Sequence, residues 1–395
     1  MRYRKFKADH LFDGKDILTG DKVLVTDEKG IVETVIEAID AGGDIEIFKG
    51  LLSPGFVNCH CHLELSHMKD VIENGTGLVD FLLKVVSKRS SVKEEIEAAM
   101  KAANEEMFDG GIVAVGDICN TPNSLQIKSG SKIRYHNFIE VLGFTEDRAK
   151  IVLDNYLDVY KEFAHAGFEK QSSIVPHAPY TISTAMFRLI NHFSAGKMIS
   201  IHNQESLAED ELYQTKTGDF LRLYHHLNIS TDFFHPYNKS SLQSYLPLLD
   251  KAQNILLVHN TFTTQSDIDF SFEQSRRTNQ HIYWCLCANA NLYIENKLPP
   301  VELLISNNCD IVVGTDSYSS NHSLSILDEL RTLQKNFPAL QMHNLLKWST
   351  SNGAKALGFD RIFGSFEKGK QPGILLIDNI IDSKISRSST VKKVL

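Results

Sequence analysis

The sequence lacks any stretch of about 18 consecutive apolar residues, the length that a transmembrane helix requires. Its basic N-terminus, MRYRKFKADH, has no apolar run behind it, so a secretory signal peptide is not expected. Basic charge is not in excess either. The formal net charge is -8, whereas nucleic-acid-binding proteins usually carry a basic face or stripe. These absences predict a cytoplasmic protein without nucleic-acid or membrane partners.

The cysteines lack the spacing of a structural zinc site. The six cysteines lie at positions 59, 61, 119, 285, 287 and 309 and form two C-x-C pairs, whereas zinc ligands usually occur as C-x2-4-C pairs. Most of them stand within apolar runs. We therefore expect buried, reduced thiols and no disulfides.

From about Leu51 onward the sequence contains an alternation of apolar strands and amphipathic helices. Residues 1–53 instead have the pattern of short strands broken by glycines, which is typical of a small β module. Later in the chain, eight strands are predicted at 55–57, 112–118, 133–142, 173–176, 198–201, 255–258, 282–285 and 311–313.

This order predicts an α/β fold in which residues 54–363 form a (β/α)8 TIM-type barrel, the expected domain for metal-dependent hydrolysis. Residues 364–395, which begin GSFEKGKQPGILLID, again have the pattern of short strands and turns. We expect the two chain ends, 1–53 and 364–395, to combine in one small composite β-sandwich.

Catalytic side chains of such barrels project from the C-terminal ends of the strands. The predicted strand ends carry His60, His62, His177, His202, His259 and Asp316. A single histidine at a strand end is more often structural, but the joint pattern is much harder to explain in that way. Two imidazoles from the first strand, one from the fifth and a carboxylate from the eighth are a plausible ligand set for Zn2+ or Fe2+.

Several segments resemble the amidohydrolase superfamily, and their order is typical of its cytosine/adenosine deaminase-like branch. They are PGFVNCHCH (54–62), PHAPYT (176–181), HNQE (202–205), VHNT (258–261), CANANL (287–292), GTDSYSSN (314–321) and GSFEKGKQPG (364–373). HLELS (62–66) and FIEVLG (138–143) look closest to the aminodeoxyfutalosine deaminase type. CANAN departs from the usual C-P-x-S-N, and Pro372 stands where aspartate or alanine is commoner.

The resemblance implies one metal ion, Zn2+ first and Fe2+ as the alternative. Binuclear members of the superfamily carry a carboxylated lysine on the fourth strand, and SSIVPHAPY has no lysine. The implied metal ligands are His60, His62, His202 and Asp316.

The implied mechanism is hydrolytic deamination of an aminated purine- or nucleoside-like heterocycle. Asp316 takes a proton from metal-bound water, His259 polarises the resulting hydroxide, and Glu205 protonates the ring nitrogen while the neighbouring amino-bearing carbon is attacked. Three residues are expected to contact the small-molecule substrate: His177, Glu64 and Asn291. The roles of Glu140 and His67 stay open.

Two alternatives remain at this point. A cyclic amide hydrolase of the imidazolonepropionase type would use the same metal but release no ammonia. A catalytically inactive barrel that serves as a binding protein would be expected to have lost a ligand, and all four are present. The oligomeric state is left open, with a homodimer as one option.

Overall fold

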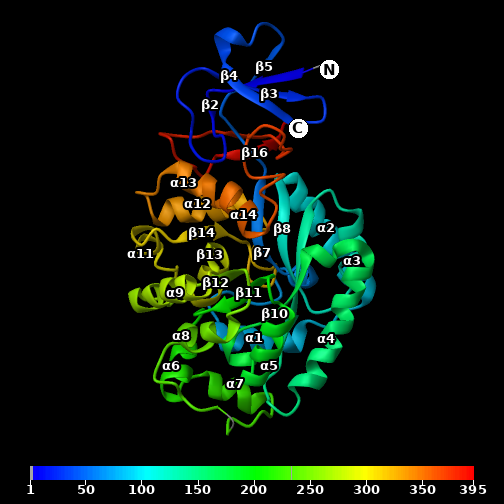
Figure 1. Cartoon of the computed structure of the whole chain (residues 1–395), viewed down its shortest axis with the longest axis vertical. Helices are drawn as coiled ribbons and strands as arrows, with labels where there is room; N and C mark the ends of the chain where they lie inside the picture. The colour runs from blue at the N-terminus through cyan, green and yellow to red at the C-terminus, as the bar shows by residue number, and fades with distance from the viewer. Residues whose placement is uncertain (1–2, 233) are drawn as a thin grey trace.

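The computed structural model describes residues 3–232 and 234–395, and each of the eight barrel strands predicted from the sequence is present (Figure 1). The barrel strands are β7 (Phe56–Cys61), β8 (Ile112–Cys119), β9 (Arg134–Val141), β10 (Ser172–Pro176), β11 (Met198–Asn203), β12 (Asn254–His259), β13 (His281–Leu286) and β14 (Asp310–Val313). Nearly every residue in them is buried, as expected for parallel strands covered on both faces.

The barrel consists of two parallel four-stranded sheets, β10-β9-β8-β7 and β11-β12-β13-β14. Backbone hydrogen bonds join them at two seams. At one seam the backbone N–H of His202 donates to the carbonyl oxygen of His177 at 3.0 Å. At the other seam the backbone N–H groups of Thr315 and Asp316 both donate to the carbonyl oxygen of His60, each at 3.0 Å.

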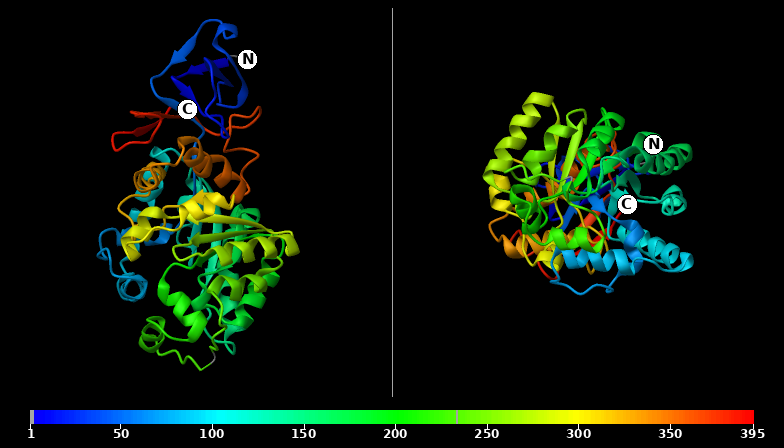
Figure 2. Two further views of the ribbon diagram at one scale, coloured as in Figure 1. Left: turned by 90° about the vertical axis from the view of Figure 1, so that its left-hand side faces the viewer. Right: turned by 90° about the horizontal axis from the view of Figure 1, so that it is seen from below.

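Helices surround the strands, as the view from below shows (Figure 2). In α2, Met100, Ala103 and Met107 recur at helical spacing and are all buried. In order, the helices are α1 (Leu78–Lys88), α2 (Lys93–Asp109), α3 (Leu125–Gly130), α4 (Ala149–Phe163), α5 (Thr184–Phe193), α6 (Leu207–Thr215), α7 (Phe220–His226), α8 (Ser241–Tyr245), α9 (Gln265–Thr278), α10 (Ala288–Glu295), α11 (Val301–Ser306), α12 (Ile326–Asn336), α13 (Met342–Lys347) and α14 (Gly353–Ala356).

Local sequence explains where several helices begin. The Ser183 hydroxyl accepts a hydrogen bond from the Met186 N–H at the start of α5, and Ser325 does the same for Asp328 at the start of α12. These caps satisfy N–H groups that have no partner inside the helix.

Both chain ends contribute to the two small sheets beside the barrel (Figure 1). One sheet has the order β4-β3-β1-β5, and the other, β16-β15-β6-β2, pairs N-terminal with C-terminal strands. The predicted fold class is therefore confirmed, while the exact domain limits stay a prediction. The strands are β1 (Tyr3–Lys7), β2 (His10–Leu11), β3 (Lys22–Asp27), β4 (Val32–Glu37), β5 (Ile45–Ile47), β6 (Leu51–Ser53), β15 (Leu375–Asp378) and β16 (Thr390–Lys393).

Two expectations about the whole chain can be compared with this fold. The six cysteines are all buried free thiols, as predicted. Among the helices in the described ranges, none is both long and apolar enough to cross a membrane.

Candidate metal centre and active site

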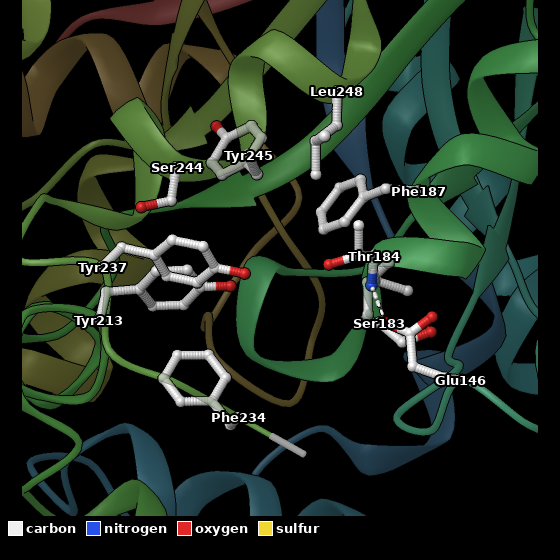
Figure 3. Close-up of a pocket in the computed structure, with 11 residues that line it drawn as sticks. Glu146, Ser183, Thr184, Phe187, Tyr213, Phe234, Tyr237, Ser244, Tyr245 and Leu248 are labelled. Carbon is white, nitrogen blue, oxygen red and sulfur yellow. Dashed lines mark hydrogen bonds between the residues drawn. The ribbon is translucent and has the colours of Figure 1, made fainter.

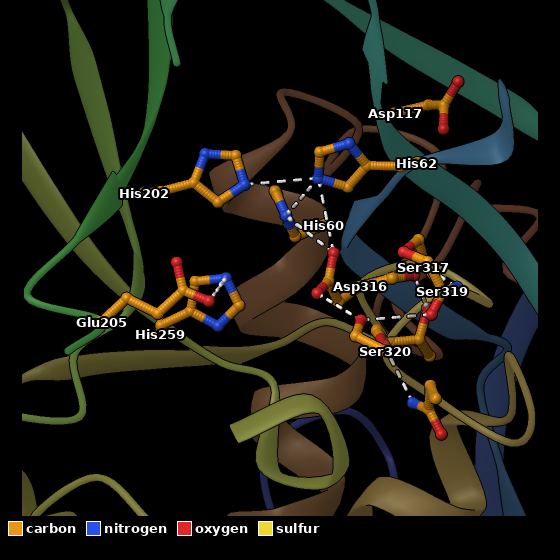
Figure 4. A network of polar contacts seen from close by, with 12 residues as sticks. His60, His62, Asp117, His202, Glu205, His259, Asp316, Ser317, Ser319 and Ser320 are labelled. Atoms are coloured by element: carbon orange, nitrogen blue, oxygen red, sulfur yellow. Dashed lines mark hydrogen bonds and ion pairs between the residues drawn. The ribbon is translucent and has the colours of Figure 1, made fainter. Parts of the chain in front are cut away.

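The four side chains predicted to bind metal converge at one end of the barrel (Figure 4). Nε2 of His62 lies 3.1 Å from Nε2 of His60 and 3.3 Å from Nε2 of His202. Oδ1 of Asp316 lies 3.4 Å from the His62 nitrogen and 3.6 Å from that of His60. Three nitrogens and one carboxylate oxygen around one point are a donor set of the kind that binds a divalent transition metal.

Hydrogen bonds to neighbouring groups orient two of these metal-binding side chains, His202 and Asp316, toward the centre of the cluster. Nδ1 of His202 lies 2.7 Å from the carbonyl oxygen of His177, which can only accept, so Nδ1 carries the proton and Nε2 a lone pair. The Ser320 hydroxyl donates to Oδ2 of Asp316 at 2.6 Å, which leaves Oδ1 for the cluster. Gly314 permits the close approach, because a Cβ there would lie 2.8 Å from the Cβ of His60.

The backbone at two strand ends is in an unusual conformation. Asp316 has a φ of +58° and His259 a φ of +75°, a region that residues other than glycine rarely adopt. Such positions cost on the order of 1–3 kcal/mol each and cluster at functional sites.

A buried ion pair that the sequence analysis missed supports the chain next to His62. Oδ1 of Asp117 accepts a hydrogen bond from the Leu63 N–H at 2.8 Å, and its Oδ2 lies 2.6 Å from Nζ of Lys128. Both charged side chains are fully buried. The available signal was Asp117 itself, a charge inside the apolar strand IVAVGDIC.

Burial keeps the imidazoles in the form that binds metal. It lowers the pKa of His62 to about 3 and the pKa values of His177 and His259 to about 4, and it holds the pKa of His202 well below its usual value. Burial raises the pKa of Asp316, but the hydrogen bond with His60 and the charges of nearby imidazoles lower it further, so the net result is well below the usual value. At neutral pH His62 and His202 are therefore neutral imidazoles and Asp316 is an ionised carboxylate, the forms that metal binding requires.

Glu205 faces the cluster from the loop after β11, and it is only 5% exposed. Its Oε1 lies 3.6 Å from Nε2 of His259. Burial, followed by the charges of Asp316 and Glu209, raises its pKa well above the usual value. Glu209 in turn accepts hydrogen bonds from the N–H groups of Gln204 and Glu205. The site therefore holds a buried carboxyl group that keeps its proton to a higher pH than an exposed glutamate does.

The cluster forms the polar end of a cavity that is partly open to solvent. Helices α1 and α7 supply an apolar wall, while Arg89, Asn120 and Glu140 add polar groups. The apolar residues of the wall are Leu78, Phe81, Leu82, Val85, Val86, Leu223 and Leu227.

The three predicted substrate contacts lie in different places. His177 lines the cavity, with Nδ1 lying 3.0 Å from the Thr181 hydroxyl. Oδ1 of Asn291 lies 3.4 Å from Nδ1 of His259, behind the cavity wall. Glu64 is directed to the loop after β8, where it accepts hydrogen bonds at Asn120 and Thr121. The structure thus brings only His177 of the three to the cavity.

A second hollow lies between α5, α6 and α8 and is lined mainly by aromatic rings (Figure 3). Among the described residues that line it, the only carboxylate is Glu146 and there is no histidine. Glu146 already accepts hydrogen bonds from the N–H groups of Thr184 at 3.0 Å and Ala185 at 2.9 Å. Groups suited to hydrolysis therefore gather at the barrel end and not in this hollow.

Comparisons with known proteins agree along most of the chain. The sequence profile of the amidohydrolase family matches residues 51–395. The adenosine deaminase of Helicobacter pylori is 27% identical over 330 residues, which cover 81% of this chain and 77% of that protein. The aminodeoxyfutalosine deaminase of Nitratiruptor sp. is 25% identical over 370 residues, which cover 91% of this chain and 87% of that protein.

Solved structures show the same fold. Helicobacter pylori aminofutalosine deaminase in complex with methylthio-coformycin matches with a TM-score of 0.80 at 22% identity, covering 95% of this chain and 92% of that chain. Guanine deaminase from C. acetobutylicum, with guanine in its active site, matches with a TM-score of 0.69 at 15% identity. The match covers 96% of this chain and 91% of that chain.

Proposed function

This chain belongs to the amidohydrolase family, and from that premise we propose that it is a hydrolytic deaminase of an aminated purine- or nucleoside-like heterocycle. One observation carries the proposal: the buried acid Glu205 lines the same cavity as His62, His202 and Asp316. A neutral aromatic C–NH2 group is a poor electrophile, so its hydrolysis requires such an acid beside the nucleophile. The names of the curated relatives, adenosine and aminodeoxyfutalosine deaminase, support the same reaction.

The donor atoms fit one divalent ion, Zn2+ first and Fe2+ as the alternative. His60, His62, His202 and Asp316 would hold it. A single ion is favoured because β10, where binuclear relatives carry their modified lysine, has none. When bound, such an ion acidifies water and supplies a nucleophile at neutral pH.

The residues of the chain then have distinct tasks. Asp316, ionised and fixed through its Oδ2 by Ser320, accepts a proton from the attacking water. His259, held by Asn291, faces the same point and polarises that water. Glu205 donates its proton to the ring nitrogen, and a proton then passes to the departing amine. Water and the C–NH2 group thus become a ring carbonyl and ammonia.

Ammonia release from a series of amino-substituted heterocycles tests the proposal. The series is adenosine, methylthioadenosine, aminodeoxyfutalosine, guanine, cytosine and pterins, with elemental analysis of the same preparation. We expect the adenine-type nucleosides to react first. Opening of imidazolonepropionate without ammonia release from any compound of the series would instead establish a cyclic amide hydrolase.

A further inference from the structure

Two buried carboxyl groups beside the metal centre have no task in the mechanism above. Glu64 lies in the short helix η2 (Leu63–Met68), and Glu140 lies near the end of β9. Asn120, in the loop after β8, connects them: its backbone N–H donates to Glu64 at 3.2 Å and its side-chain amide to Oε2 of Glu140 at 3.0 Å.

Both oxygens of Glu64 are occupied by that loop. Oε2 accepts from the Asn120 N–H, while Oε1 accepts from the Thr121 N–H at 3.2 Å and from the Thr121 hydroxyl at 3.0 Å. Glu64 is not among the residues that line the cavity. Its carboxylate therefore holds the loop in place, and Asn120 with it.

Glu140 differs in that one oxygen is available. The residue is 2% exposed and lines the cavity, yet Oε1 has no hydrogen-bond partner among the described residues. A buried acceptor without a donor costs about 1–3 kcal/mol, so native proteins rarely leave one unpaired. A donor brought by the substrate would satisfy it.

The position of this oxygen shows which part of a substrate it can meet. Oε1 of Glu140 lies 3.6 Å from Nδ1 of His202, whereas the metal donor of that ring is Nε2. Glu140 therefore lies beside the nitrogen of the His202 ring that faces away from the cluster. This position suits a contact with a substituent of the heterocycle rather than with the carbon under attack.

We propose that Oε1 of Glu140 accepts a hydrogen bond from a hydroxyl group on this substituent, and that Glu140 thereby selects nucleosides over free bases. The inference rests on the proposed deaminase function and defines its substrate class more closely. Glu140 is a specificity-determining contact that Asn120 positions, and Glu64 acts on it only through the loop.

The experiment measures kcat/KM for ammonia release from adenosine, 2′-deoxyadenosine, 3′-deoxyadenosine and 9-methyladenine, which has no hydroxyl. In the wild type, one deoxy compound should react about 5- to 100-fold less well than adenosine, as expected when a buried acceptor is left without its hydrogen-bond donor. Glu140→Gln should lower kcat/KM for adenosine by a similar factor, because Asn120 needs the amide oxygen and turns the nitrogen to the cavity. The rate with 9-methyladenine should change by less than about 3-fold.

Glu64→Gln is the matched control, and it should change kcat/KM for all four compounds by a common factor. Metal content and Tm of each variant verify the fold. A wild type that does not distinguish adenosine from either deoxy compound overturns the assignment without any variant. An equal loss for all compounds in Glu140→Gln, or a hydroxyl-selective loss in Glu64→Gln alone, also overturns it. A wild type that releases ammonia from other heterocycles of the series above, but from none of these four compounds, overturns this inference and leaves the proposed function standing. Ammonia release from no compound of either set overturns both.

Discussion

Replacement of Glu205 by glutamine separates metal binding from proton transfer. The side chain is buried, its Oε1 lies 3.6 Å from Nε2 of His259, and its carboxyl group has no hydrogen-bond partner among the described residues. Glutamine has nearly the same shape, so Glu205→Gln should retain the fold and the metal. What it loses is a proton that the carboxyl group can donate.

The expected loss in kcat is about 10²- to 10⁴-fold, the usual contribution of a general acid or base. The pH dependence has a defined sign. Burial raises the pKa of Glu205, so the protonated form persists to a higher pH than usual and activity should fall as pH rises through that raised pKa. The residual activity of Glu205→Gln should lack this alkaline decrease, because its amide does not titrate.

Turnover is followed by ammonia release over a pH series, with metal content and Tm measured on the same samples. Glu211→Gln is a suitable control, because Glu211 is an exposed carboxylate on α6 and lies outside the cavity. Near-normal turnover of Glu205→Gln, or an unchanged alkaline decrease, would refute the role given to Glu205.

Three further predictions test other parts of the structure. Purified protein should carry about one Zn or Fe per chain and His60→Ala should lose it, as elemental analysis would show; two ions per chain would contradict the single-ion site. Asp117→Asn should lower the free energy of unfolding in urea by about 3–5 kcal/mol, because Lys128 is then a buried, unpaired charge; Asp117→Leu combined with Lys128→Met should recover much of this loss. Burial raises the pKa of Glu329 to about 8 in the folded state, so wild-type stability should fall as pH rises from about 4.5 to about 8, and Glu329→Gln should show a shallower decrease.

The barrel could be predicted because each of its strands has a recognisable pattern within a few consecutive residues. Parallel strands are buried on both faces and therefore appear as apolar runs, and polar residues directly after them mark the functional end. His60 and His62, two residues apart, illustrate this well. Their strand, β7, begins within one residue of the predicted position.

Contacts of long side chains could not be predicted in the same way, because they depend on rotamers and on how loops pack. Glu64 stands two residues after His62, yet its carboxylate is directed to the loop after β8. Glu140, left open in the sequence analysis, reaches the cavity. Asn291 stands beside His259, and Asp117 of β8 forms a buried ion pair with Lys128 of α3, the next element along the chain.

The metal centre lies where the two half-barrels meet, and this explains why its ligands come from both. His60 lies in β7 and His62 directly follows it, whereas His202 lies in β11 and Asp316 follows β14, two strands of the other sheet. The backbone bonds that close both seams involve the same residues, since the His202 N–H donates at one and the Asp316 N–H at the other. A ligand present at 100 times its Kd stabilises the folded state by about 2.7 kcal/mol. An ion held by these four residues therefore stabilises the closed barrel at both seams, and it offsets the left-handed backbone at Asp316.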